Sequence, residues 1–230
     1  DPDAHRAVLF DQRASGRRLP TPPKKVSTGS GCPICRAQPD RVTALILGAF
    51  STGTAYDVDW LTVHAGRFFP AEWKTFVHHI PPLMRHSRVV EAYNDLLMAA
   101  DPTIRNQAAQ QWCNWENAHV ATTAAWRPNA RFDDPKFRLG FARQVTHCWR
   151  HNNWLDDDQI IRDAGRLADI PGWLIHGRLD LSGPLDAPWK LHQAWPRSTL
   201  IIVDDEGHGG IRMAEHWSRI LCDLATKSLD

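Results

Sequence analysis

Two short apolar runs in the last third of the chain constrain its fold most strongly. They cover Trp173 to His176 and Leu200 to Val203, and glycine and charged residues follow each one, as is typical of buried strands. Residues 189–194 between them have the spacing of a helix. Strand, helix and strand in this order predict an α/β fold with a mostly parallel sheet.

Each of these strands is followed by a residue that could do chemistry. Asp180 comes after the first strand and His208 after the second. Each residue alone is more often a turn former or a solvated histidine. Together they follow the order in which α/β-hydrolases present the acid and the base of a catalytic triad. We therefore predict that Asp180 orients His208, which would accept the proton of a serine nucleophile.

The composition excludes several other classes of protein. The chain has 230 residues, of which 43% are hydrophobic and 23% charged, so it can form a globular core. A net charge of +1 gives no basic field, so neither nucleic acid nor a membrane is predicted as a partner. No apolar run could span a bilayer and Asp1 to Arg6 lack a signal pattern, which predicts a cytoplasmic protein if Asp1 is the true start.

The pattern of apolar residues changes twice along the chain. Residues 6–13 and 42–50 have the composition of strands, and we expect the second to be central and buried. Helical spacing of apolar residues runs from about 58 to 169 and predicts a helical cap, and a final helix is predicted over 213–225. The predicted division is therefore 1–55 and 169–230 for the α/β core and 56–168 for the cap.

Cysteine and tryptophan allow more than one interpretation. Five scattered cysteines favour reduced thiols, and Cys32 and Cys35 form a C-x-x-C pair that could serve redox chemistry or half of a zinc site. The other three cysteines lack ligand spacing, so no metal is predicted. Eleven tryptophans indicate either core packing or a pocket for an apolar group.

Many motifs, in one order, resemble those of the proline iminopeptidases, a branch of the α/β-hydrolases. The resemblance covers about four-fifths of the chain. Its motifs include residues 7–17, 39–42, 59–60, 69–70, 80–81 and 92–93, Trp112-Cys113-Asn114-Trp115-Glu116, Asp169-Ile170-Pro171, Gly177-Arg178-Leu179-Asp180, residues 191–196 and Gly207-His208.

The resemblance implies a function and a site. It implies a serine aminopeptidase that releases proline from the amino terminus of peptides, without metal or cofactor, with Asp180 and His208 as triad acid and base. Glu116 would bind the substrate amine. Val145 stands where the family has a second acid, which implies weaker binding of that amine because a buried charge pair loses one partner.

The region of the nucleophile departs from the family pattern. The chain looks truncated before its first strand, where the family has a glycine-rich oxyanion loop, and shortened around the nucleophile elbow. Ser27 is the best remaining nucleophile and Ser30 a second, but Lys25 replaces the first elbow glycine and Pro33 interrupts the following helix. A flexible Ser/Gly loop is the alternative interpretation of this patch.

Two hypotheses follow for the function. The first is an active prolyl aminopeptidase with Ser27, His208 and Asp180 as its triad. The second is a catalytically impaired relative that acts as a binding module or has no function. A sheet that lacks the elbow strand would also leave unpaired edges, so we expect low stability or self-association.

Overall fold

The computed structural model describes residues 42–227, and within them a parallel three-stranded sheet organises the chain. The strands are β1 (Leu45–Gly48), β2 (Gly172–Gly177) and β3 (Ser198–Val203), in the order β1-β2-β3. This arrangement confirms the predicted α/β class. The predicted strand at 6–13, the candidate nucleophiles Ser27 and Ser30, and the Cys32/Cys35 pair lie outside the described residues.

The first described strand differs from the prediction of one central, buried strand over 42–50. β1 covers only Leu45–Gly48 and is half-buried, and Ala49 follows it with a φ of 48°. Among the described strands β2 is the central one, paired with β1 on one side and with β3 on the other. β2 is also the most buried, because helices cover both of its faces.

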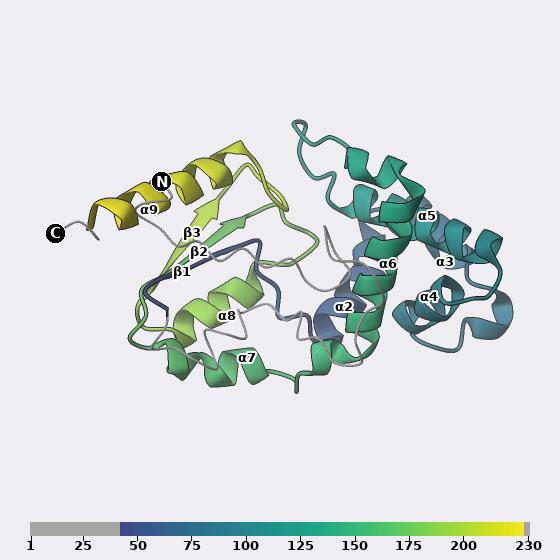
Figure 1. The fold of residues 1–230 in the computed structure, drawn as a ribbon, viewed down its shortest axis with the longest axis horizontal. Coiled ribbons are helices and arrows are strands. Elements are labelled where there is room, and N and C mark those ends of the chain that lie inside the picture. The colour runs from purple at the N-terminus through teal and green to yellow at the C-terminus, as the bar shows by residue number, and fades with distance from the viewer. Residues whose placement is uncertain (1–41, 228–230) are drawn as a thin grey trace.

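Successive residues of β2 point into two different cores, as the alternation of a strand requires. Leu174 packs with Leu191 and Trp195 on the side of α8 (Asp186–Ala194), whereas Ile175 packs with Met213 on the side of α9 (Ile211–Lys227). Figure 1 shows α8 and α9 on opposite faces of the sheet. Both helices had been predicted, and each begins two or three residues earlier than expected.

Five longer helices lie between β1 and β2. They are α2 (Ala55–Thr62), α3 (Pro70–His78), α4 (Val89–Leu97), α5 (Pro102–His119) and α6 (Pro135–Arg150). Single turns of 3-10 helix lie between them at His64–Arg67, Pro82–Met84 and Ala130–Asp133, and another at Asn152–Trp154 follows α6. α5 and α6 begin at an Asp-Pro step, where the aspartate accepts a hydrogen bond from the backbone N–H two residues later and proline occupies the first turn.

Aromatic rings form the core of this helical layer. The ring of Phe76 stacks between Tyr93, at 4.5 Å between centroids, and Trp115, at 5.4 Å. Trp112 meets both Phe76 and Tyr93 edge-on. Trp112, Trp115 and Trp195, which follows α8, are buried, which confirms core packing for these three tryptophans.

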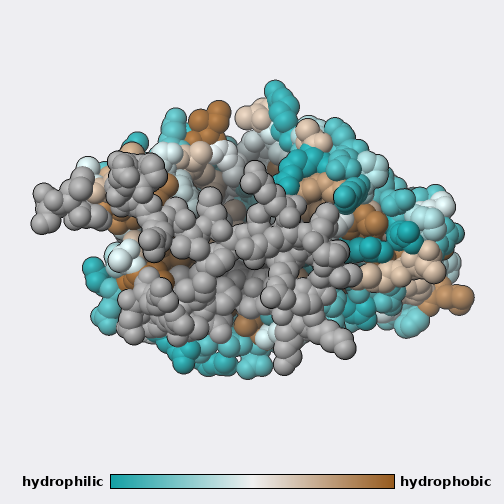
Figure 2. Space-filling view, viewed as in Figure 1, coloured by the Kyte–Doolittle hydropathy of each residue, from teal (hydrophilic) through white to brown (hydrophobic). Residues whose placement is uncertain are grey.

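The helical layer lies beside the carboxyl ends of the strands rather than over a face of the sheet (Figure 1). On the side drawn in Figure 2, hydrophilic residues predominate over these helices and hydrophobic ones form small separate patches. α7 (Gln159–Arg162) and the turn Asp163–Leu167 pack instead against α8 and β2. The predicted domain boundaries remain a prediction.

No helix within residues 42–227 has the length and apolar character needed to cross a membrane.

Candidate functional site

Asp180 lies in a tight loop after β2 that holds its carboxylate away from water. The carboxylate is fully inaccessible, and its Oδ1 accepts hydrogen bonds from the backbone N–H groups of Ser182, at 2.9 Å, and Gly183, at 3.1 Å. These two bonds fix the orientation of the group. Its second oxygen, Oδ2, is left to face the loop that follows β3.

His208 supplies the partner of that second oxygen. Its Nδ1 lies 2.9 Å from Asp180 Oδ2, and because a carboxylate only accepts, Nδ1–H is the donor. The imidazole is 46% exposed, so the other ring nitrogen, Nε2, is available to a substrate or a nucleophile. The structure therefore brings together the predicted acid and base from two loops that lie 28 residues apart in the sequence.

Two glycines allow these loops to come so close. A Cβ on Gly177 would lie 2.1 Å from the carbonyl oxygen of Gly207, and a Cβ on Gly207 would lie 2.2 Å from Thr122 Oγ1. Thr122 follows α5, so the helical layer packs directly onto the histidine loop. The glycines of both motifs are thus explained by close approach of neighbouring chain segments.

The electrostatics of the pair favour its charged form. Burial opposes ionisation of Asp180, but the hydrogen bond and the charge of His208, with smaller contributions from His176 and the Gly183 N–H, hold its pKa below 3.8. Loss of hydration lowers the pKa of His208, but the hydrogen bond and charge of Asp180, together with the charge of Glu116, outweigh it and raise the pKa above 6.5.

His176 is a residue of the site that sequence reasoning missed. Its ring is fully buried beneath Asp180, with Nε2 2.7 Å from the carbonyl oxygen of Gly183, to which it donates, and 3.7 Å from Asp180 Oδ2. Burial is the largest influence on this ring and keeps its pKa below 6.5, despite the charge of Asp180 and the bond to Gly183. The one available signal was a histidine inside an otherwise apolar strand.

Glu116 faces the same space as His208 from the helical layer. Its side chain is 15% exposed, Oε1 accepts from Trp112 Nε1 at 3.0 Å, and Oε2 lies 3.2 Å from His119 Nε2. A cavity of about 590 Å³ separates Glu116 from His208. Its other lining residues include Val120, Trp126, Phe132, Phe141, Asp205, Glu206 and Gly207.

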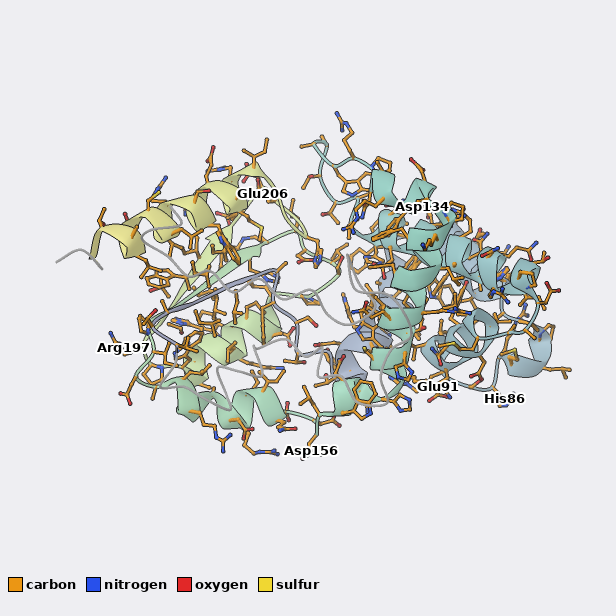
Figure 3. All side chains as sticks on the ribbon, in the orientation of Figure 1. His86, Glu91, Asp134, Asp156, Arg197 and Glu206 are labelled. Carbon is orange, nitrogen blue, oxygen red and sulfur yellow. The ribbon has the colours of Figure 1, made fainter. Side chains whose placement is uncertain are left out.

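Glu206, labelled in Figure 3, lies where the sheet layer meets that cavity. Its carboxylate accepts hydrogen bonds from the backbone N–H groups of Arg212 and Met213 at the start of α9, at 2.8 and 2.9 Å. It therefore caps the helix, whose positive end favours a carboxylate. Both of its oxygens have backbone partners, so the capping of α9 accounts for a glutamate at position 206.

Val145 is half-buried and packs against the aromatic core of the helical layer, so this position contributes an apolar contact. Within residues 42–227 no three His, Cys, Asp or Glu side chains are grouped to hold a metal ion. Ser27 lies outside the described residues.

Comparison with known proteins identifies the family. The chain is 37% identical to a probable proline iminopeptidase of Streptomyces coelicolor over 246 residues, which covers 90% of this chain and 76% of the relative. It is 33% identical to a proline iminopeptidase of Xylella fastidiosa, with 90% and 76% covered. It is 30% identical to one of Arabidopsis thaliana, with 90% and 63% covered.

No protein-family model matches the chain. The relatives alone are sufficient to assign the family, because several carry the same name and their alignments cover nine-tenths of the chain, at up to 37% identity. The parallel sheet, with an acid after β2 and a histidine after β3, agrees with the fold of such enzymes. The chain therefore belongs to the proline iminopeptidase family of α/β-hydrolases.

Proposed function

We propose that this chain is a serine aminopeptidase that releases proline from the amino terminus of peptides. The observation that carries the proposal is the Asp180–His208 pair, whose imidazole lines the same cavity as the carboxylate of Glu116. A base and a group that binds an ammonium thus lie on opposite sides of one space. An aminopeptidase needs this arrangement, because the bond it cleaves lies one residue from a free amine.

The chemical steps follow from these positions. A serine hydroxyl, with Ser27 as the candidate, attacks the carbonyl carbon of the first residue while His208 Nε2 takes its proton. The same nitrogen then gives that proton to the departing amine, which leaves an acyl ester on the serine. Water, deprotonated by His208, hydrolyses the ester and releases the amino acid. Asp180 keeps the imidazole in the required tautomer and stabilises its cation throughout.

The cavity supports the choice of a small apolar first residue. Val120, Trp126, Phe132 and Phe141 present apolar surface beside Glu116, and a pyrrolidine ring with its ammonium nitrogen needs both kinds of neighbour. With Val145 in place of a second acid, Glu116 carries the recognition of the amine. We therefore expect a high KM for prolyl substrates.

Hydrolysis of L-prolyl-4-nitroanilide by the purified chain tests this proposal. Substitution Glu116→Gln should raise KM by about 30-fold or more, because the ammonium loses its charged partner. Glu91→Gln, on α4 and outside the cavity, is the matched control, and its KM should not change. Equal KM values for the two variants would contradict the role of Glu116.

The second candidate is a binding module without catalysis, which Lys25 and Pro33 beside Ser27 favour. A fluorophosphonate probe followed by peptide mapping separates the two. Label on Ser27 supports hydrolysis with this residue as the nucleophile, and label on another serine would identify that serine as the nucleophile instead. Absence of label from a folded protein that still binds L-prolinamide would favour the binding module.

A further inference from the structure

A buried histidine connects the two sides of the proposed site. His119, in the last turn of α5, is 1% exposed, and its Nδ1 lies 2.8 Å from Ser182 Oγ. Its Nε2 lies 3.2 Å from Glu116 Oε2. We propose that His119 and Ser182 form a positioning relay that couples the amine-binding carboxylate of Glu116 to the loop that holds Asp180. This inference rests on the proposed function.

On the far side of His119 the relay continues through Ser182 to the triad acid. The backbone N–H of Ser182 donates to Asp180 Oδ1 at 2.9 Å, and Asp180 Oδ2 accepts from His208 at 2.9 Å. The same serine thus uses its side chain toward the helical layer and its backbone toward the triad acid. A displacement of Ser182 would change a hydrogen bond that orients Asp180.

The chemistry of the groups sets the direction of each bond. A carboxylate only accepts, so the imidazole must present Nε2–H to Glu116. In the neutral ring Nδ1 is then an acceptor, and the hydroxyl of Ser182 donates to it. Both nitrogens of His119 are needed, one for each neighbour, and glutamine or phenylalanine at this position could not serve both in the same geometry.

The contact to Glu116 is short of a full hydrogen bond. Although Nε2 of His119 lies at ion-pair distance from the carboxylate, it is a buried nitrogen that has no hydrogen-bond partner among the described residues. A buried donor without an acceptor is costly, so a rotation of Glu116 that completes this bond is favoured. The bound ammonium of a substrate would hold Glu116 in one rotamer and thereby fix His119.

Two other side chains within residues 42–227 also hold the loop around Asp180, and comparison with them shows what the relay adds. Trp60 Nε1 donates to the carbonyl oxygen of Leu181 at 2.9 Å, and His176 donates to that of Gly183 at 2.7 Å. Neither Trp60 nor His176 lines the cavity. Of these three side chains His119 is the one that contacts Glu116, so it offers a route by which substrate binding at Glu116 can reach Asp180.

The chain offers a matched control for the serine. His192 Nδ1 lies 2.8 Å from Ser198 Oγ, the same pair of groups at the same distance, in α8 and β3 away from the cavity. Ser182→Ala removes the bond to His119 and keeps the backbone N–H that Asp180 needs. Ser198→Ala removes the corresponding bond away from the cavity, together with the bond from Ser198 Oγ to the carbonyl oxygen of Trp195.

The first measurement tests whether a change at Ser182, in the loop of Asp180, alters the binding of an amine at Glu116. Calorimetry would compare the binding of L-prolinamide with that of cyclopentanecarboxamide, which has the same ring and carbonyl without the amine. The expected result is that Ser182→Ala reduces the preference for L-prolinamide by about five- to tenfold, the worth of one hydrogen bond between neutral groups. Ser198→Ala should leave this preference unchanged.

The second measurement tests whether a change at His119, in the helical layer, alters the hydrogen bond between Asp180 and His208. The proton of His208 Nδ1 that is shared with Asp180 should give a far-downfield proton resonance, and His119→Gln should shift or broaden it, whereas His192→Gln should not. If His119→Gln fails to fold by circular dichroism, the same resonance in Ser182→Ala replaces it. A resonance and a ligand preference that are both unchanged in Ser182→Ala would overturn the relay.

The two proposals fail in different ways. If the unaltered chain does not prefer L-prolinamide to cyclopentanecarboxamide, the role of Glu116 and the proposed function are contradicted. The proposed coupling between a bound amine and Asp180 is then contradicted as well. If it does prefer L-prolinamide and Ser182→Ala keeps that preference and the resonance, the proposed function stands and the relay is wrong.

Discussion

The carboxylate of Asp180 is fully buried, while the imidazole of His208, 2.9 Å away, is nearly half-exposed. Its hydrogen bond to His208 keeps the buried carboxylate charged, and the accessible imidazole can exchange a proton with whatever enters the cavity. This division is the one that a carboxylate and a base need for general base catalysis.

Removal of the charge on Asp180 should abolish most of the activity. Asp180→Asn retains the size of the side chain but offers an amide to His208, which stabilises the wrong tautomer and no longer supports the cation. In triads such a change lowers kcat by about 10⁴-fold, and we expect a similar loss. Steady-state hydrolysis of L-prolyl-4-nitroanilide measures it, with Asp95→Asn, exposed and outside the cavity, as control. A kcat within tenfold of the unaltered chain would remove Asp180 from the mechanism.

The pH dependence of activity should follow the raised pKa of His208. The base must be neutral to accept a proton, so kcat/KM should rise with pH through a value above 6.5. Nuclear magnetic resonance of the imidazole gives the same value directly. Both Asp180→Asn and Glu116→Gln should lower it, because each removes a negative charge that raises it. An imidazole that titrates below 6.5 in the unaltered chain would contradict the electrostatic account.

The same two groups predict how stability depends on pH. The folded pKa of His208 is raised, so its contribution is complete below 6.5 and is lost as pH rises through the folded value. The folded pKa of Asp180 is lowered, so its contribution is present above 3.8 and is lost as pH falls through the folded value. Urea unfolding across this range should show that the destabilisation caused by His208→Ala is greatest between these limits. A difference that does not vary with pH would contradict the prediction.

Gly207 should tolerate a methyl group only if Thr122 is shortened. Gly207→Ala places a Cβ 2.2 Å from Thr122 Oγ1, and such overpacking typically costs about 1–3 kcal/mol. Thr122→Ala removes that oxygen and leaves the nearest remaining atom of residue 122 at 3.7 Å, so the double variant should recover stability.

Gly177→Ala is the contrasting variant for this prediction. Its Cβ would meet the backbone oxygens of Gly207 and Glu206 at 2.1 and 2.4 Å, which no side-chain change can relieve. Thermal melts of the three variants measure the difference. Failure of Thr122→Ala to rescue Gly207→Ala would show that the close contact is not the cause.

We expect the chain to self-associate. Within the described residues β3 pairs with β2 alone, and an unpaired strand edge can pair with another molecule. Sedimentation velocity over a range of concentrations should show a species heavier than 26.1 kDa that grows with concentration. A cooperative melt from a protein that stays monomeric throughout would contradict this expectation.

Local patterns in the sequence determined several elements of the fold. The spacing of apolar residues predicted a helical region between β1 and β2, and the Asp-Pro steps at which α5 and α6 begin are likewise local signals. These features depend on neighbouring residues, so they can be read without the rest of the molecule. The sequence also placed Asp180 and His208 after adjacent strands, which implied that they meet.

The extent and position of β1 could not be read in the same way. Residues 42–50 have the composition of a buried strand, yet pairing covers only Leu45–Gly48, because β2 begins opposite Leu45 and Ala49 leaves the extended conformation with a φ of 48°. Composition reports the tendency of a segment to be buried, and burial itself depends on what packs against it.

By itself the sequence determined the α/β order, the family motifs and the candidate acid, base and amine-binding residue. Only the tertiary structure shows that His176 lies beneath Asp180 and that His119 lies between Glu116 and Ser182. It also shows that Thr122 lies in close contact with Gly207. These contacts join segments from separate layers of the fold. Hydrogen bonds and close packing act over a few ångströms in space, and the distance between residues along the chain does not report them.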